Sequence, residues 1–283
     1  MENKYVTIQD VNRLRKIFKE KNWINFPNED SVFNNFCHLL NNLADEQKQL
    51  IHELTEKYLW ISSNDYANRF NTILNNIDDN YLLTCRKIYL FPVIKPEDEP
   101  NIKSGKHCIY IFKGLFALNP KFSDINIEII EDFESLKSIV FKNDGSELIF
   151  LIDDFIGSGE TFTATLDEAK KNQTLSEKFI LVLSLVIQLD ALNVIKNKYG
   201  LFTLYSELGK KGITDEYESP EKEQKIKVME QIEKYIKPNF FSFGYERCEA
   251  LVTMIRTPDN TFPFFWMKSK INGIEFLPPF PRN

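Results

Sequence analysis

Two adjacent acids and two glycines stand close together near the middle of the chain, in the run Asp153-Asp154-Phe155-Ile156-Gly157-Ser158-Gly159-Glu160-Thr161. The run follows five apolar residues, 148–152, that are typical of a buried strand, and it precedes a stretch typical of a helix. Glycines let a backbone approach a ligand closely, and the free N–H groups of a helix N-terminus favour a phosphate. Ser158 and Thr161 add hydroxyl donors, while carboxylates accept from sugar hydroxyls and bind Mg²⁺. The pattern therefore predicts a site for a phosphorylated sugar at the end of a strand.

This run resembles the ribose-phosphate signature of type I phosphoribosyltransferases, in which apolar residues, two acids and two further apolar residues precede a small residue, Ser, Gly, any residue and Thr. The first loop position is often Ser or Thr in that family and is Gly157 here, which removes one hydroxyl contact and keeps the backbone cradle. The resemblance implies that Asp153 and Asp154 contact the ribose 2′- and 3′-hydroxyls and act in catalysis. It also implies Mg²⁺ as a cofactor, without identifying its protein ligands, and a phosphate- and ribose-binding role for Phe155, Ile156, Gly157, Ser158, Gly159, Glu160 and Thr161.

Other phosphate-binding patterns fit this run less well. A P-loop needs Gly-Lys-Ser or Gly-Lys-Thr, which the sequence lacks. Dinucleotide and methyltransferase loops place glycines directly after the strand, without two acids first, and prefer Gly-x-Gly-x-x-Gly. Paired acids at a strand end also occur in receiver domains and in nucleotide-hydrolysing enzymes, which stay as the alternatives.

Two further segments are candidates for ligand contacts. Lys103-Ser104-Gly105 precedes an apolar run, 108–112, that predicts a strand. Type I enzymes carry a short pyrophosphate-binding loop early in the sheet, so the resemblance implies this role for Lys103, Ser104 and Gly105, a solvated connector being the alternative. The segment from 244 to 266 resembles the carboxy-terminal end of a subgroup found in bacterial conflict and antiphage loci, some beside reverse transcriptases in retrons. In it, Asn260 is a candidate ligand-facing residue, with a structural turn as the alternative.

The elements around these residues predict an α/β fold. Near-continuous apolar runs at 88–91, 108–112, 148–152 and 179–186 indicate strands buried on both faces, as in a parallel sheet covered by helices. A crossover helix is expected from Thr161 to about Lys171, a late helix at 220–235 and a last strand at 250–255. Helical spacing of apolar residues before residue 85 predicts an N-terminal helical domain at 1–84, for which a winged helix is one form. Residues 85–283 are then a phosphoribosyltransferase-like (Rossmann-like) domain.

Composition narrows the class of protein. A net charge of −6 and a pI near 5.3 do not suggest a duplex-DNA binder, and residues 1–86 hold ten Lys and Arg against twelve Asp and Glu. This weakens the hypothesis of a DNA-binding regulator. The four cysteines are spread out and form no Cys-x-x-Cys pair, which favours reduced thiols. With no apolar run of membrane-spanning length and no apolar leader, we expect a cytoplasmic chain that meets no membrane.

Together these features predict a protein that binds phosphoribosyl pyrophosphate or a nucleotide with Mg²⁺. The resemblance implies a glycosyltransferase, or a nucleotide hydrolase, acting as a bacterial antiphage effector, with a reverse transcriptase and its nucleic acid as candidate partners. The alternative is a catalytically inactive module of the same fold that senses a nucleotide. An intact pyrophosphate loop favours catalysis, and a blocked one favours sensing.

Overall fold

The chain divides into two compact units. The computed structural model describes residues 5–101, 103–237, 239–271 and 274–282. One unit is continuous, from Asn64 to Gly209, and we call it the sheet unit. The other is built from both ends of the chain, up to Ser63 and from Lys210, and we call it the helical unit.

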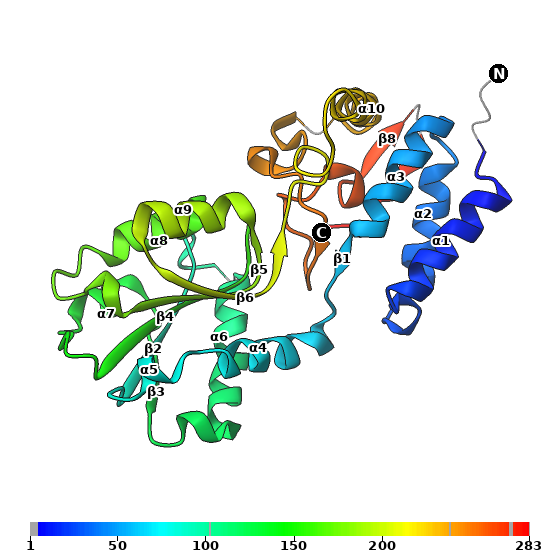
Figure 1. Ribbon diagram of the computed structural model, residues 1–283. Helices are drawn as coiled ribbons and strands as arrows, with labels where there is room; N and C mark the ends of the chain where they lie inside the picture. The colour runs from blue at the N-terminus through cyan, green and yellow to red at the C-terminus, as the bar shows by residue number, and fades with distance from the viewer. Residues whose placement is uncertain (1–4, 102, 238, 272–273, 283) are drawn as a thin grey trace. The chain divides into compact units, whose positions relative to one another are not determined.

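A five-stranded parallel sheet, in the order β3-β2-β4-β5-β6, forms the centre of the sheet unit. Its strands are β2 (Lys87–Pro92), β3 (Asn126–Ile129), β4 (Glu147–Ile156), β5 (Ile180–Gln188) and β6 (Phe202–Gly209). Its helices are α4 (Tyr66–Asn75), α5 (Asp79–Leu82), α6 (Ser104–Leu118), α7 (Phe133–Ser138), α8 (Glu160–Ala169) and α9 (Leu189–Tyr199). Helices cover both faces: α8 and α9 lie on one face, and α4 and α6 on the other (Figure 1). The parallel sheet and the crossover helix α8 confirm those predictions.

Strand burial explains the continuous apolar runs. Every residue of β5 is buried, and so are all but two of β4. Ile149 and Leu151 of β4 belong to the core that includes Phe162 of α8, while Phe150, between them, packs against Phe116 of α6 with the ring centroids 6.1 Å apart. Alternate residues of one strand therefore pack on helices of opposite faces, so both sets must be apolar.

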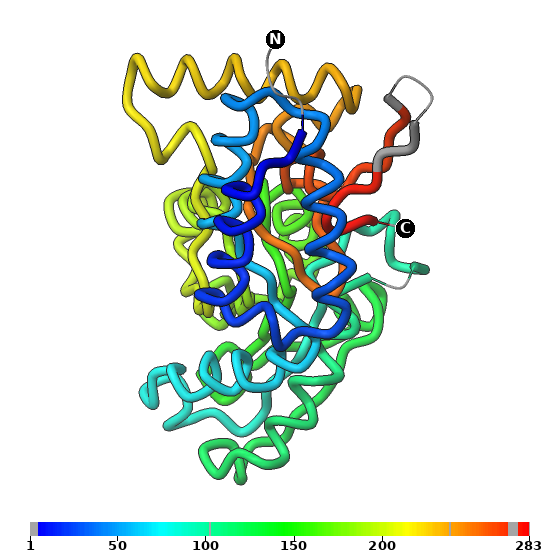
Figure 2. The backbone as a smooth tube through the Cα atoms, turned by 90° about the vertical axis from the view of Figure 1, so that its right-hand side faces the viewer, coloured from blue at the N-terminus to red at the C-terminus, as the bar shows by residue number. Residues whose placement is uncertain are grey.

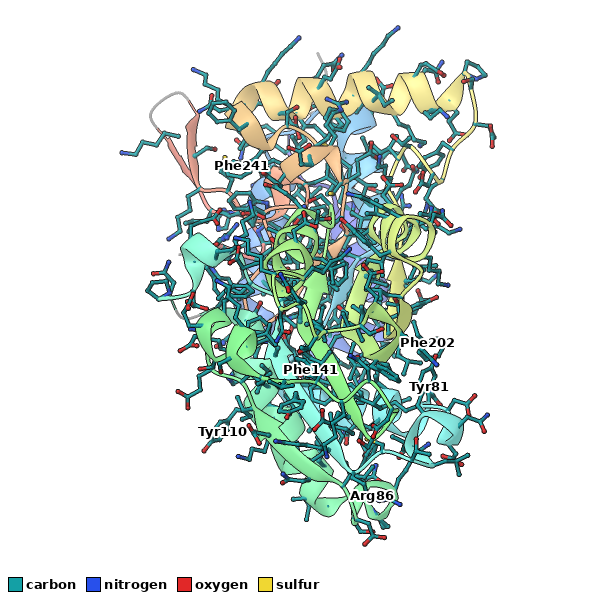
Figure 3. The ribbon with its side chains drawn as sticks, turned by 90° about the vertical axis from the view of Figure 1, so that its left-hand side faces the viewer. Tyr81, Arg86, Tyr110, Phe141, Phe202 and Phe241 are labelled. Atoms are coloured by element: carbon teal, nitrogen blue, oxygen red, sulfur yellow. The ribbon has the colours of Figure 1, made fainter. Side chains whose placement is uncertain are left out.

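One predicted strand is a helix. The apolar run 108–112 lies inside α6, whose buried residues Cys108, Phe112 and Phe116 recur at helical spacing. Tyr110, between two of them in sequence, is 79% exposed (Figure 3). A short apolar run fits a buried strand and one turn of a buried helix face equally well. The deciding feature is the length of the element, because α6 continues for 15 residues.

The helical unit has a shared core made by the two ends of the chain. Its elements are α1 (Ile8–Glu20), α2 (Glu29–Leu40), α3 (Asp45–Lys57), β1 (Leu59–Trp60), α10 (Glu221–Ile236), β7 (Val252–Thr253), β8 (Ser269–Ile271) and β9 (Ile274–Phe276). The C-terminal segment runs beside the first helices (Figure 2). Tyr58 and Phe280 stack with their ring centroids 5.0 Å apart, and Phe36 packs edge-on against Phe265. β1 pairs in parallel with β7.

Two boundaries in the structure differ from those that the spacing of apolar residues predicts: the division between the units and the extent of a late strand. The units divide after Ser63 and after Gly209, which differs from the predicted boundary between residues 84 and 85. The reason is packing: α4 joins the sheet unit through Phe70, whose ring lies 4.2 Å from that of Phe112. The predicted strand 250–255 shortens to the two residues of β7. Among residues 5–84, all described, we find no β-hairpin of the kind that forms the wing of a winged helix.

Two aromatic side chains mark the open edge of the sheet. Phe202 begins β6, the edge strand, and its ring lies 5.2 Å from that of Tyr81 in α5 (Figure 3). Phe202 remains 39% exposed. No helix of the described residues combines the length and the apolar character needed to cross a membrane.

Candidate functional site

The two acids lie inside strand β4, close to its carboxyl end. Asp153 pairs with Ser184 of β5, and the strand continues to Ile156. Asp153 is 7% exposed and Asp154 is 6% exposed. The sequence places the acids at the end of the strand, but they are buried inside β4, because the strand is longer than its apolar run. Ligands of open α/β sheets bind at this carboxyl edge, so the position still suits a site.

Hydroxyl groups from two different helices reach the two carboxylates. Ser104, the first residue of α6, donates to Asp153 Oδ1 over 2.9 Å, and the backbone N–H of Asp154 donates to the same oxygen. Tyr66, the first residue of α4, donates to Asp154 Oδ2 over 2.8 Å. Neither acid forms an ion pair with a described Lys, Arg or His. The acid pair is thus hydrogen-bonded but keeps its negative charge uncompensated.

This environment disfavours ionisation of both acids together. Burial raises the pKa of Asp153 well above its ordinary value, and the charge of Asp154 raises it further, while the hydrogen bond from Ser104 opposes the shift. A cation beside the two carboxylates would remove both penalties. Mg²⁺ in proteins is commonly held by one or two carboxylates together with water and phosphate oxygens, so the donor set fits this ion. The described residues contain no cluster of three or more metal-ligating side chains.

The loop after β4 turns at a glycine and opens a helix. Gly159 has φ +82° and ψ 1°, a left-handed conformation that favours glycine, and it is the N-cap residue of α8. As a glycine it supplies no side-chain cap. The first intrahelical bond joins the Thr163 N–H to the Gly159 carbonyl, so the N–H groups before it have no intrahelical acceptor. That of Glu160 contacts Ser158 Oγ over a long 3.3 Å. The loop can thus present donors to an oxyanion.

A lysine that sequence reasoning missed lies beside this helix terminus. Lys95 follows β2 by three residues, and its Nζ donates to Glu160 Oε1 over 2.6 Å. The hydrogen bond to Glu160 raises the pKa of Lys95, so the side chain stays protonated. The side chain of Glu160, which the resemblance assigns to the phosphate and ribose site, is 46% exposed and pairs with Lys95. A basic residue in a polar stretch just after a strand was the signal available in the sequence.

The residues of the candidate pyrophosphate loop separate in the structure. Ser104 reaches Asp153, as described. A Cβ on Gly105 would lie 3.1 Å from the Ile152 carbonyl oxygen, so this glycine permits a close approach of α6 to β4. Lys103 instead pairs with Asp98, with its Nζ 3.0 Å from Oδ2. The structure therefore brings Ser104 and Gly105 to the acid pair, whereas the ammonium of Lys103 is engaged elsewhere.

Asn260 belongs to the helical unit, where it is 9% exposed. Its side-chain amide donates to the Tyr245 carbonyl over 3.2 Å and to Cys248 Sγ over 3.1 Å. The Asn260 carbonyl oxygen would lie 2.0 Å from a Cβ on Gly244, so the two segments are in direct contact. These contacts favour the structural-turn alternative for Asn260.

Comparison with known proteins adds a family and two distant structural likenesses. The PRTase-CE family model matches residues 20–282. No curated protein matches the chain in sequence. Hypoxanthine-guanine phosphoribosyltransferase from Schistosoma mansoni, solved in complex with IMP, is 20% identical, with a TM-score of 0.31; the match covers 53% of this chain and 66% of that one. Orotate phosphoribosyltransferase from Aeropyrum pernix is 12% identical, with a TM-score of 0.31, over 59% and 78% of the two chains.

Proposed function

Because this chain belongs to the PRTase-CE family of phosphoribosyltransferase-like proteins from conflict systems, we propose that it binds a ribose-5-phosphate ligand with Mg²⁺ at the carboxyl end of β4. The ligand is phosphoribosyl pyrophosphate or a nucleotide. One observation carries the proposal. A buried acid pair leads, within five residues, into a left-handed Gly159 that opens α8 with no side-chain cap. Acceptors for sugar hydroxyls and donors for a phosphate thus adjoin each other.

Each part of the site has a distinct role in this proposal. The N–H groups of 157–161 bind the 5′-phosphate, with the Thr161 hydroxyl as a further donor. Asp153 and Asp154 accept hydrogen bonds from the ribose hydroxyls and so orient C1. Mg²⁺, when bound, neutralises charge on the departing diphosphate. Lys95 already pairs with Glu160 in the first turn of α8. In the complex, its ammonium group pairs with a ligand phosphate instead of Glu160.

The reaction that suits this arrangement is substitution at the ribose C1. The bond from C1 to the leaving group breaks, and a base nitrogen or a water oxygen forms the new bond. Attack by water would degrade a nucleotide or its precursor, and an antiphage effector would thereby deplete a nucleotide pool. In either case the acid pair orients the sugar, and the loop holds the phosphate in place.

A second candidate function is nucleotide sensing without turnover. The observation in its favour is the pairing of Lys103 with Asp98, which leaves the expected pyrophosphate loop without that cation. A protein with an intact phosphate loop and a weak pyrophosphate site would bind a nucleotide and hold it.

Calorimetric titration tests the proposal. Ribose-5-phosphate and phosphoribosyl pyrophosphate, each with Mg²⁺, should bind wild type and should not bind Gly159→Val, in which a branched side chain stands at positive φ in the phosphate loop. Gly200→Val is the matched control, because Gly200 also has positive φ, at 65°, but ends α9 outside the loop. Equal binding by wild type and Gly159→Val would refute the site. Release of pyrophosphate from bound phosphoribosyl pyrophosphate would decide for turnover over sensing.

A further inference from the structure

Tyr66 contacts the acid pair from a helix outside the sequence motif. It is the first residue of α4 and is 1% exposed. Its hydroxyl donates to Asp154 Oδ2 over 2.8 Å, across 88 positions of sequence. A buried phenol needs a partner for its hydroxyl, and a hydrogen bond to a charged acceptor is among the stronger ones that proteins form.

The rest of α4 is fixed to the sheet, so the phenol has little freedom to leave. One turn further along, Arg69 Nη1 donates to Ser206 Oγ over 3.0 Å and to Glu207 Oε1 over 2.6 Å, both on β6. Phe70 packs against Phe112 of α6, and the ring of Tyr66 packs edge-on against Phe70. The helix is thus anchored on β6 and on α6.

We propose that Tyr66 is a positioning residue of the ribose site, and this inference rests on the function proposed above. With Oδ2 held by the phenol, the Asp154 carboxylate has one orientation, and its other oxygen is presented in one place to a ribose hydroxyl. Ser104 does the same for Asp153 from α6. Helix α4, which precedes the sheet and lies outside the family's loop motif, therefore belongs to the ligand site.

The chemistry of the donor supports this role. A lysine or arginine at this position would neutralise Asp154 and compete with a metal ion. A phenol donates one hydrogen bond and leaves the carboxylate charge in place. Tyr66 can therefore hold Asp154 without taking away the charge that a ribose hydroxyl or Mg²⁺ would meet.

The affinities for two ligands distinguish a role of Tyr66 in positioning Asp154 from a general effect of the substitution on folding. Inorganic phosphate uses only the loop 157–161, whereas ribose-5-phosphate also uses the acids. Tyr66→Phe should weaken the binding of ribose-5-phosphate about tenfold, the size of one hydrogen bond to a charged group. It should leave the affinity for inorganic phosphate unchanged. Tyr199→Phe is the control, because that buried hydroxyl has no hydrogen-bond partner among the described residues, and both affinities should stay at their wild-type values.

A double-mutant cycle with Asp154→Ala, which removes the acceptor of the Tyr66 hydroxyl, provides the second measurement. If Tyr66 acts through Asp154, then Tyr66→Phe should cause no further loss of ribose-5-phosphate affinity once Asp154 is Ala. Equal ribose-5-phosphate affinities of wild type and Tyr66→Phe would overturn the role of Tyr66 while leaving the proposed function intact. So would an equal loss for both ligands, because a structural role affects the loop as well. If wild type binds neither ligand, the proposed function itself fails, and the role of Tyr66 fails with it.

Discussion

The same substitution at two glycines of the sheet unit should change stability in opposite directions. Gly159 caps α8 with φ +82°, and a Cβ there would meet Ala191 Cβ at 3.5 Å, an ordinary van der Waals contact. Space is therefore available, and the cost of Gly159→Ala is the left-handed backbone alone, about 1–2 kcal/mol. Gly114 is an exposed residue inside α6, and a Cβ there meets nothing within 4 Å. Gly114→Ala should stabilise by about 0.5–1 kcal/mol.

Denaturant unfolding followed by far-ultraviolet circular dichroism measures both changes. The three tryptophans, Trp23, Trp60 and Trp266, all lie in the helical unit. Their fluorescence therefore reports that unit, and circular dichroism is needed to follow the sheet unit. The two variants should differ by roughly 1.5–3 kcal/mol in free energy of unfolding, with wild type between them. If Gly159→Ala is as stable as wild type or more stable, then Gly159 is not left-handed, and the argument for an uncapped phosphate-binding terminus fails.

Three further changes test other parts of the sheet unit. Because burial, and then the charge of Asp154, raises the pKa of Asp153 above 3.8, the contribution of Asp153 to the free energy of unfolding should fall as pH rises through the window between 3.8 and the raised value. Asp153→Asn has no titrating carboxyl at this position, so its free energy of unfolding relative to that of wild type should increase with pH. A difference that stays constant with pH would contradict the pKa shift. Thr165→Val should lower the free energy of unfolding by about 1–3 kcal/mol, because the buried Ile94 N–H loses its acceptor, Thr165 Oγ1; denaturant curves that overlay those of wild type would refute this. Limited proteolysis should cut between Lys95 and Lys106 more readily than within β4 or β5, because those two strands are buried at the centre of the sheet unit; the reverse order would contradict that burial.

The sequence predicted the strands that are buried on both faces, because the central strands of a parallel sheet need uniform apolar runs. β4 and β5 appear where 148–152 and 179–186 predict them, each longer than its run. The run 108–112 misled because five apolar residues do not distinguish a strand from a buried helix face. The exposure of Tyr110 identifies the run as part of a helix, but that exposure is known only from the structure.

Within the candidate site, the sequence located the loop motif and named Ser104, but it missed Tyr66 and Lys95. Residue types alone were enough to identify the acids and the loop, because the whole motif lies within nine consecutive residues. Tyr66 and Lys95 reach the site across 88 and 65 positions. The tertiary packing of α4 and of the segment after β2 selects them, and the one signal in the sequence is the place of Lys95 just after a strand. Nothing in residue type separates them from other tyrosines and lysines of the chain.

The interruption of the helical unit has a consequence for how the chain is made. Residues up to Ser63 leave the ribosome before the sheet unit, but their core partners Phe265 and Phe280 come after the whole sheet unit. That unit spans 64 to 209, which is 146 residues, so synthesis takes roughly 7–30 s to pass it. During that interval the core of α1, α2 and α3 lacks its C-terminal partners, whereas the sheet unit can already fold. A nascent chain that stops near Gly209 would therefore carry all residues of the proposed ligand site attached to helices prone to aggregation or proteolysis.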